Sequence, residues 1–290
     1  MYDALGSGPP PVVTFIPILP ATMRTTLEAV LELGANHPPP TQAFHDAPLH
    51  SNALSPLLTS FRTDLTLFQK FITIGKSISE ISLQFANKAN TESYVLNIQV
   101  HDNYLGPVNA LIHRLMGYEA SLTDVISATQ SPLGRTSLRD QTSTFWIRGN
   151  LFITLRHNPP SPSSTSLSSF LSELHSLATA VDTYLQAGSV QPPLHLQPDT
   201  QLAAPAPKTV KVNELFTLRL AEAAMERNYE QMVGWSSDES VIASEGVAET
   251  GSGVFNFMAL KEGKAVLEIR VAQRETLFPR HAVIGIQVVA

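Results

Sequence analysis

The chain of 290 residues contains no cysteine, and it carries few charges for its length. Without cysteine there is no disulfide, no thiolate metal ligand, no iron–sulfur cluster and no cysteine nucleophile. Charged residues make up 15% of the chain, against about 25% in an average globular protein. The net charge of −6 argues against a nucleic-acid surface. The apolar fraction of 43% supports a core, yet no run of 18 apolar residues predicts a membrane span.

Familiar catalytic and targeting motifs are also missing. The start, Met1-Tyr-Asp-Ala-Leu-Gly-Ser-Gly-Pro-Pro-Pro, has neither a positive segment nor a long apolar one, so it is not a secretory signal. This favours a cytoplasmic protein, with a secreted mature form as the alternative. There is no Gly-x-Ser-x-Gly, no phosphate-binding loop, no dinucleotide fingerprint and no His-Glu-x-x-His. We therefore expect a non-enzymatic protein with no cofactor and no metal.

Composition divides the chain. Residues 1–200 carry 24 charged side chains, whereas residues 201–290 carry 20. Between the two parts, residues 189–208 hold five prolines and scattered alanines, which is typical of a semi-extended linker. We expect one domain over 1–188 and a second over 209–290.

The first part mixes helical and strand patterns. The spacing predicts helices over 21–33, 107–116 and 167–185, and a stripe of apolar residues predicts another that Gly75 ends: Leu57, Phe61, Leu65, Phe68 and Ile72. Alternation predicts a hairpin of strands 81–85 and 94–100, and a second one over 145–155 that turns at Gly149-Asn150. This order favours an α+β domain in which helices cover an antiparallel sheet.

The last 80 residues alternate throughout. Strands are predicted at 210–220, 241–244, 254–258, 265–271 and 282–289, with turns at 251–253 and 261–264. About seven short strands in so short a segment favour a small immunoglobulin-like β-sandwich.

Three runs in this segment carry a resemblance to a known family. They are Glu214-Leu-Phe-Thr-Leu-Arg-Leu, Trp235-Ser-Ser-Asp-Glu-Ser-Val and the run from Gly251 to Ile269. Together they resemble the chagasin family of cysteine-protease inhibitors, which are immunoglobulin-like sandwiches. The resemblance implies a protein partner, a papain-like protease, whose cleft is filled by three loops.

The resemblance also implies which residues contact the partner. In the first loop, 224–230, Tyr229 is retained and Asn228 stands where the family has Gly, while the family's central Pro-Thr-Thr is absent. The second loop keeps Gly251 and Gly253. In the third, 274–278, Arg274 is the match to the family's Arg-Pro-Trp. Apolar residues on loops are common interface anchors, which adds Leu277 and Phe278.

Two further resemblances keep alternatives open. The same runs are similar to bacterial immunoglobulin-like adhesion modules, which implies a structural or adhesion role with the sandwich as a spacer. The first half is similar to small α+β domains of bacterial surface lipoproteins, for which no activity is implied.

Other polar and aromatic groups have a functional and a structural interpretation. A Pro-rich loop holds His37, His45, Asp46 and His50, but their spacing matches no metal-ligand frame. His101 and Asp102 could form a general base with its orienting carboxylate, although Asp102 or Asn103 capping the next helix is the alternative. A small-ligand or hydrolytic site in the first domain is therefore a third hypothesis.

One aromatic pair could line a ligand groove. Phe145 and Trp146 are adjacent on a predicted strand, so alternation would place only one of them on the core face.

Overall fold

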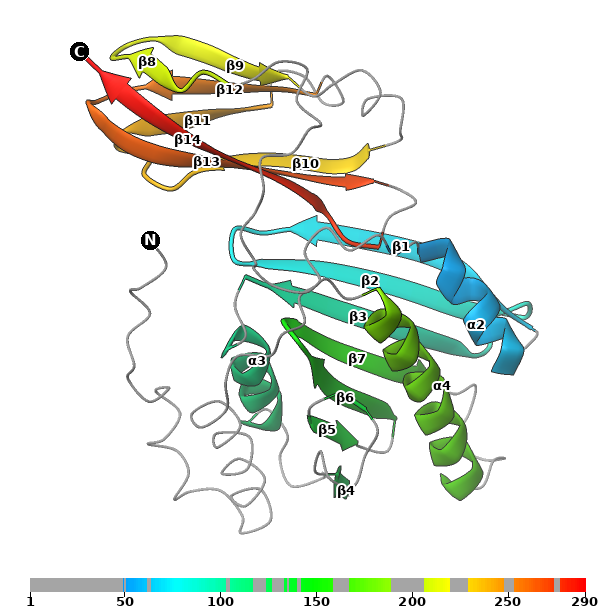
Figure 1. The fold of residues 1–290 in the computed structure, drawn as a ribbon. Helices are drawn as coiled ribbons and strands as arrows, with labels where there is room; N and C mark the ends of the chain where they lie inside the picture. Colours follow the sequence, from blue (N-terminus) through cyan, green and yellow to red (C-terminus); the bar gives the residue numbers. More distant parts are fainter. Residues whose placement is uncertain are drawn as a thin grey trace, which may run out of the picture. The chain divides into compact units, whose positions relative to one another are not determined.

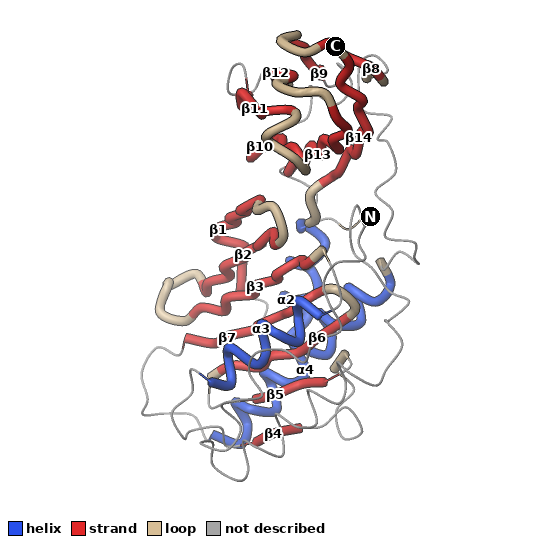
Figure 2. The backbone as a smooth tube through the Cα atoms, turned by 90° about the vertical axis from the view of Figure 1, so that its left-hand side faces the viewer, coloured by secondary structure: helices blue, strands red, loops and turns tan. Residues whose placement is uncertain are grey.

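The structure is a computed structural model that describes residues 49, 51–61, 64–102, 105–116, 124–126, 133–134, 136–139, 142–158, 167–188, 206–219, 229–247, 253–273 and 277–290. Strand is the dominant conformation, with few helices and several antiparallel sheets (Figures 1 and 2). Two compact units divide the chain. The helix expected at 21–33 and most of the expected linker lie outside the described residues.

A seven-stranded sheet runs through the first half of the chain in the order β1-β2-β3-β7-β6-β5-β4. Its neighbours β3/β7, β7/β6, β6/β5 and β5/β4 are antiparallel. The elements of this half are η2 Ser51–Ala53, α2 Leu54–Phe61, β1 Leu65–Ile74, β2 Ile78–Asn87, β3 Ser93–His101, α3 Leu105–Met116, β4 Asp124–Ile126, β5 Thr136–Arg139, β6 Ser143–Arg148, β7 Leu151–Asn158 and α4 Leu167–Ala187.

The strand predictions with a period of two are confirmed. In β2 and β3 every second side chain is buried, because alternate residues of a strand point to the same face. The β6–β7 hairpin also forms, with Arg148 opposite Leu151 across a two-residue turn. Of the two turn residues only Gly149 takes a positive φ, 56°. The turn therefore does not require a left-handed backbone conformation at Asn150.

The helix expected through Leu57 and Ile72 is wrong beyond Phe61. The helix ends there, and Leu65–Ile74 forms β1 instead. Apolar steps of four and three residues predict a helical stripe, but the segment from Leu65 is rich in aromatic and β-branched residues that suit a strand, and it lies beside β2. The strands β4 and β5 were not predicted either.

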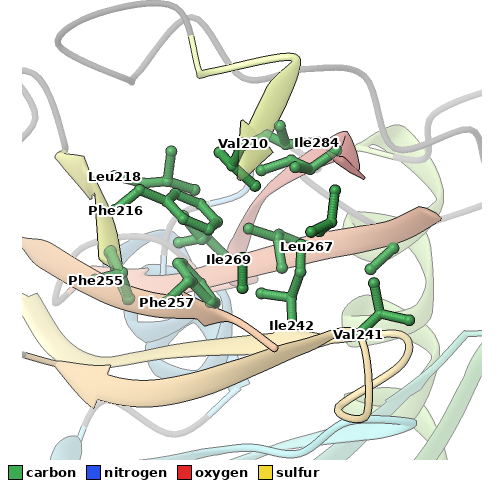
Figure 3. Close-up of a cluster of buried hydrophobic side chains, with 14 of the residues drawn as sticks. Val210, Phe216, Leu218, Val241, Ile242, Phe255, Phe257, Leu267, Ile269 and Ile284 are labelled. Carbon is green, nitrogen blue, oxygen red and sulfur yellow. The ribbon is translucent and has the colours of Figure 1, made fainter. Parts of the chain in front are cut away.

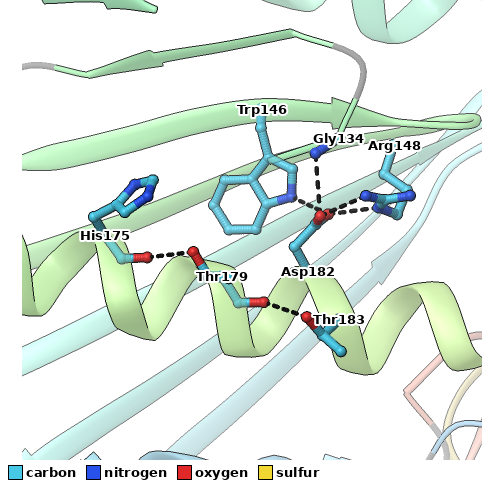
Figure 4. Close-up of polar contacts among 7 residues, drawn as sticks. All are labelled: Gly134, Trp146, Arg148, His175, Thr179, Asp182 and Thr183. Atoms are coloured by element: carbon cyan, nitrogen blue, oxygen red, sulfur yellow. Dashed lines mark hydrogen bonds and ion pairs between the residues drawn. The ribbon is translucent and has the colours of Figure 1, made fainter. Parts of the chain in front are cut away.

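Helix α4 packs on the sheet through a buried stripe and a polar cluster. Its buried apolar side chains are Leu174, Leu177, Ala178, Val181 and Leu185. The Asp182 carboxylate accepts hydrogen bonds from Trp146 Nε1 at 2.9 Å and from Arg148 Nε and Nη2, both at 2.5 Å (Figure 4). The Gly134 amide donates to it as well, at 3.1 Å. The cluster therefore fixes the helix at one register against β6.

In the last part of the chain two smaller sheets share one core. Their strands are β8 Thr209–Lys211, β9 Leu215–Arg219, β10 Tyr229–Ser236, β11 Ile242–Val247, β12 Val254–Ala259, β13 Gly263–Gln273 and β14 Arg280–Val289. One sheet has the order β10-β13-β14-β8 and the other β11-β12-β9. Side chains of both meet in one cluster that includes Phe216, Phe257, Ile242, Leu267 and Ile284 (Figure 3). We call these two sheets the paired sheets.

Two features of the paired sheets differ from the sequence prediction. The strand expected over 210–220 is two strands, which a turn at Asn213 separates; this residue has φ 66° and its amide donates to the Ala259 carbonyl at 2.8 Å. Strand β10, Tyr229–Ser236, was not predicted.

The second unit also contains two segments from the first half of the chain. It comprises Phe44–Leu54, Phe71–Ile81 and Gly188–Ala290, whereas the first unit includes Ser55–Lys70 and Ser82–Ala187. The expected division at residues 188 and 209 assigned neither early segment to the second domain. Within the described residues, no helix has the length and apolar character to cross a bilayer.

The Asp182 cluster yields a stability prediction. Replacement of Asp182 by alanine removes the acceptor of the buried Trp146 indole N–H and of two Arg148 N–H groups, so we expect a loss of about 3–5 kcal/mol in the free energy of unfolding. Urea unfolding followed by tryptophan fluorescence measures it. Thr183→Ala, on the exposed side of the same helix, is the control and should change stability by less than about 0.5 kcal/mol. Equal losses in both variants would contradict this role for Asp182.

Candidate functional site

The site expected from the sequence is the set of three loops 224–230, 251–253 and 274–278, which lie at the connections from β9 to β10, from β11 to β12 and from β13 to β14. In the sheet β11-β12-β9, Arg219 pairs with Val254 and Val247 pairs with Phe255, so β9 and β11 end where β12 begins. In the other sheet, Tyr229 pairs with Gln273 and Val271 with Arg280, so β13 ends where β10 and β14 begin. Each connection thus leaves from the same end of its sheet.

Contacts between the two sheets join β10 to β11 and β12 farther along the strands. The Ser244 hydroxyl on β11 donates to the Gly234 carbonyl on β10 at 3.0 Å. A Cβ on Gly234 would lie 3.1 Å from the Phe255 ring and 3.2 Å from the Phe257 ring, so the β10 backbone lies directly on the first half of β12. We call the end at which β9, β11 and β13 finish and β10, β12 and β14 begin the loop end.

The individual candidate residues differ in how the structure places them. Asn228, Gly251 and Arg274 lie outside the described residues. Tyr229 is the first residue of β10, and only its backbone is described. Gly253 precedes β12 with φ 64°, a conformation that favours glycine, so this glycine of the resemblance has a backbone reason to be there.

Leu277 and Phe278 are not exposed. Their exposed fractions are 0% and 1%, and the Leu277 amide donates to the Leu49 carbonyl at 2.7 Å. Burial of apolar side chains by other parts of the same chain stabilises the folded state, also where these side chains lie on a connection. Neither residue is therefore available to a partner in this structure, and the expected set of exposed anchors loses both.

A buried arginine near the loop end was not singled out in the sequence. Arg270 on β13 is 1% exposed; its Nη1 donates to the Gly75 carbonyl at 2.9 Å and its Nη2 to the Lys76 carbonyl at 3.1 Å. Its Nε donates to Glu268, and its guanidinium lies 5.2 Å from the centre of the Trp235 ring. Alternation alone would have placed Arg270 on a solvated face, so no local signal marks it.

The segment after Trp235 has a local structural role. The Asp238 carboxylate accepts hydrogen bonds from the Ser240 hydroxyl at 2.6 Å and the Ser240 amide at 2.9 Å. These bonds lower the pKa of Asp238, the hydroxyl contributing most. The Ser-Ser-Asp-Glu-Ser run of the resemblance thus builds the turn from β10 to β11.

His101 is a buried residue at the end of β3. Its amide donates to the Asn150 carbonyl at 3.0 Å and its carbonyl accepts from Asn150 Nδ2 at 2.7 Å. Its ring Nε2 has no hydrogen-bond partner among the described residues, and burial lowers the pKa of His101 to about 4. A Cβ on Gly106 would lie 2.4 Å from Nδ1, so the start of α3 covers the ring. With 4% of its surface exposed, His101 is buried in this structure.

A histidine–carboxylate pair that the sequence analysis missed lies at the other end of β3. His157 Nε2 is 2.6 Å from Glu92 Oε1, and its ring stacks on Tyr94 at 4.5 Å. The Tyr94 hydroxyl donates to Glu173 on α4 at 2.9 Å. Cross-strand pairing of Tyr94 with His157 explains the stack, which ties α4 to β3 and β7. Only the pairing of β3 with β7 brings these residues together, so this contact could be predicted only by a reader who knew that pairing.

The remaining sequence candidates that the structure describes give no exposed site. The expectation that only one of Phe145 and Trp146 faces a core is wrong: both are buried, because α3 and α4 both contact β6. Trp146 also bonds Asp182 as described above, so neither residue lines an open groove. The residues His37, His45, Asp46 and His50 lie outside the described residues. Where the chain is described, no group of three or more histidine or acidic residues could hold a metal.

Comparison with known proteins adds no relative. No protein-family model matches the chain, and no curated protein matches its sequence.

The depressed pKa of His101 predicts acid sensitivity. The unfolded chain binds a proton at this residue near pH 6.5 and the folded chain only near pH 4, so protonation favours unfolding as the pH falls through this window. We expect His101→Gln to remove about 3 kcal/mol of the stability difference between pH 7 and pH 4. Urea unfolding at both pH values measures this. His113→Gln, an exposed histidine on α3, should keep the acid loss; an unchanged loss in His101→Gln would contradict the assignment.

Proposed function

We propose that this is a non-enzymatic protein-binding protein whose partner contacts the loop end of an immunoglobulin-like β-sandwich formed by the paired sheets. The first unit, in this proposal, is an α+β domain with a helix-covered antiparallel sheet. The partner class that the sequence resemblance implies is a papain-like cysteine protease. Inhibition would be steric, because the loops fill the cleft without offering a bond in register for cleavage.

The strand arrangement supports an immunoglobulin-like sandwich. In that fold the second, fifth and fourth strands form one sheet and the third, sixth and seventh form the other. Here β9, β12 and β11 are the second, fifth and fourth of seven strands, and β10, β13 and β14 are the third, sixth and seventh. The first strand, β8, adds to β14 in parallel. The buried cluster between the sheets supplies the core that a sandwich needs.

The observation that carries the binding role is the common origin of the three connections. Residues 219, 247 and 254 meet at one end of one sheet, and residues 229, 273 and 280 at the corresponding end of the other. Loops that leave a rigid scaffold from one end can act together on one partner, as binding loops on sandwiches do.

The three connections contribute unequally in this proposal. The first two carry Asn228 with Tyr229, and Gly251 with Gly253, and they provide the contact surface. The third carries Arg274, but its apolar residues Leu277 and Phe278 are covered. Contact through two connections favours weaker binding than a three-loop wedge, because less apolar surface is removed from water.

Titration against papain tests the proposal. Active-site-titrated papain is assayed with a fluorogenic peptide while the full chain is added at up to micromolar concentration. We expect reversible competitive inhibition and no cleavage at the loop end, which mass spectrometry of the recovered chain checks. An unchanged papain rate at micromolar chain would reject protease inhibition and leave the spacer role as the better interpretation.

Two glycine variants distinguish a role of the loop end from a role of the rest of the sandwich. Gly253→Val forces a β-branched residue into φ 64°, which should shift the second connection and weaken papain inhibition about tenfold or more. Gly285→Ala is the matched control, since a Cβ on Gly285 would meet nothing within 4 Å. Inhibition constants and thermal midpoints of both variants are compared with the parent. Equal inhibition by Gly253→Val and the parent would exclude the second connection from the contact.

A further inference from the structure

Strand β9 is the last strand of its sheet, and its outer edge is open. Among the described residues it pairs with β12 alone. The Ala259 amide donates to the Glu214 carbonyl, so every second residue of β9 after Glu214 bonds β12, as in any antiparallel ladder. Leu215, Thr217 and Arg219 therefore direct their backbone N–H and C=O groups away from β12. We call the backbone groups of these three residues the open edge.

The side chains beside the open edge are exposed as well. Leu215 has an exposed fraction of 57%, and Thr217 and Arg219 are also exposed. Phe216 and Leu218 alternate with them and point into the buried cluster of the paired sheets (Figure 3). A strand that adds to the open edge would therefore cover exposed apolar surface while it bonds the backbone groups.

The other three edges of the paired sheets carry features that hinder strand addition. Strand β10 has an irregular register between Tyr229 and Gln231, and β11 has one between Ser244 and Gly246. Strand β8 has only three residues. Bulges and very short strands keep sheet edges from pairing with other chains. Strand β9 has no register shift over its five residues and no proline, and its one charge, Arg219, stands at its end. It is thus the edge best suited to strand addition.

The residues of the open edge are suited to pairing with a second copy of themselves. A two-fold axis beside Thr217 would place Thr217 of one copy opposite Thr217 of the other, and Leu215 of each copy opposite Arg219 of the other. All three residues of each open edge would then form hydrogen-bonded pairs across the contact. The two Arg219 guanidinium groups would lie at opposite ends of the contact, and the aliphatic part of each arginine would pack on Leu215.

Other antiparallel registers fit less well. A shift by two residues in either direction leaves one residue of each open edge outside the pairing of the two strands, and a register centred on Arg219 places like charges opposite each other. The register centred on Thr217 also continues a polar row, because Asn256 on β12 lies opposite Thr217. The row would run from Asn256 through the two Thr217 side chains to Asn256 of the second copy, and cross-strand threonine pairs stabilise a sheet.

We propose that a second copy of this chain adds to the open edge of β9, antiparallel and centred on Thr217, so that two three-stranded sheets form one continuous sheet. This inference goes beyond the proposed function and does not depend on it. Because β9 ends at the loop end, two antiparallel β9 strands direct the loop ends of the two copies in opposite directions. A contact through so short a strand is small, so we expect a reversible dimer with a dissociation constant of about 10–100 µM.

Sedimentation velocity of the full chain, over a concentration series that spans this dissociation constant, tests the proposal. Leu215→Lys places an ammonium opposite Arg219 of the second copy, so the dissociation constant should rise about tenfold or more. Addition of Arg219→Glu to Leu215→Lys should restore association, because the two introduced charges then attract across the contact. The two positions lie about 13 Å apart on one strand, so the restored attraction is not between groups of the same chain.

Two further variants complete the experiment. Thr217→Pro removes an N–H that β12 does not use, a position at which an edge strand tolerates proline, and it should also raise the dissociation constant about tenfold or more. Val266→Lys is the matched control, since it exchanges an exposed apolar residue for lysine on β13, which has a neighbour on each side. It should associate as the parent does. Thermal midpoints report the folding of each variant, and where Thr217→Pro lowers the midpoint, Leu215→Lys and the double variant decide.

Three outcomes would overturn the proposal. A parent that stays monomeric over the whole series would reject a second copy as the occupant of the open edge. Association that neither Leu215→Lys nor Thr217→Pro weakens would place the contact elsewhere. Loss of association in Leu215→Lys without recovery in the double variant would reject the register centred on Thr217. None of these results depends on papain, so failure of the dimer and failure of protease inhibition are distinguishable.

Discussion

A guanidinium that leaves water must find partners for its donors, and in the second unit this requirement falls on Arg270. The side chain is on the outer face of β13, where alternation would ordinarily expose it, yet it is buried. Its donors are taken by Glu268 and by the carbonyls of Gly75 and Lys76. A buried charge without such partners costs several kcal/mol, so the turn at 74–76 and the outer face of the sheet stabilise each other.

The same requirement shapes strand β10. Its inward positions hold Met232, Gly234 and Ser236, while Gln231 and Trp235 point to the outer face with Arg270. Gly234 fits this place because a Cβ would come within 3.1 Å of the Phe255 ring and 3.2 Å of the Phe257 ring, which leaves little room for a larger residue. Gly234 and Ser236 stand inside, whereas Val233 and Trp235 stand outside, so β10 lacks the alternation typical of a half-buried strand. The missing alternation explains why the sequence analysis missed β10, although it predicted the neighbouring strands with regular alternation.

Local pattern succeeded where one face of an element meets one core. Strands β2, β3 and β12 follow from periodicity, because every second side chain is buried. The hairpin of β6 and β7 was predicted from two apolar runs around Gly149-Asn150, although β6 is buried on both faces. Local pattern failed at Leu65–Ile74, where the spacing of the apolar residues fits both a helix and a strand. The segment forms a strand because it pairs with β2. The loop-end connections were expected from a resemblance, and the registers explain why they share an end: three strands stop where three others start.

The burial of Leu277 and Phe278 shows that a local sequence pattern does not distinguish an exposed loop residue from a buried one. Both residues follow a strand end and precede a proline, a setting typical of an exposed loop. The Leu277 amide donates a hydrogen bond to the carbonyl of Leu49, more than two hundred residues earlier in the chain. An apolar pair on a connection has the same sequence whether it binds a partner or packs against its own chain. Which of the two roles such a pair takes depends on contacts remote in sequence, such as the bond between Leu277 and Leu49.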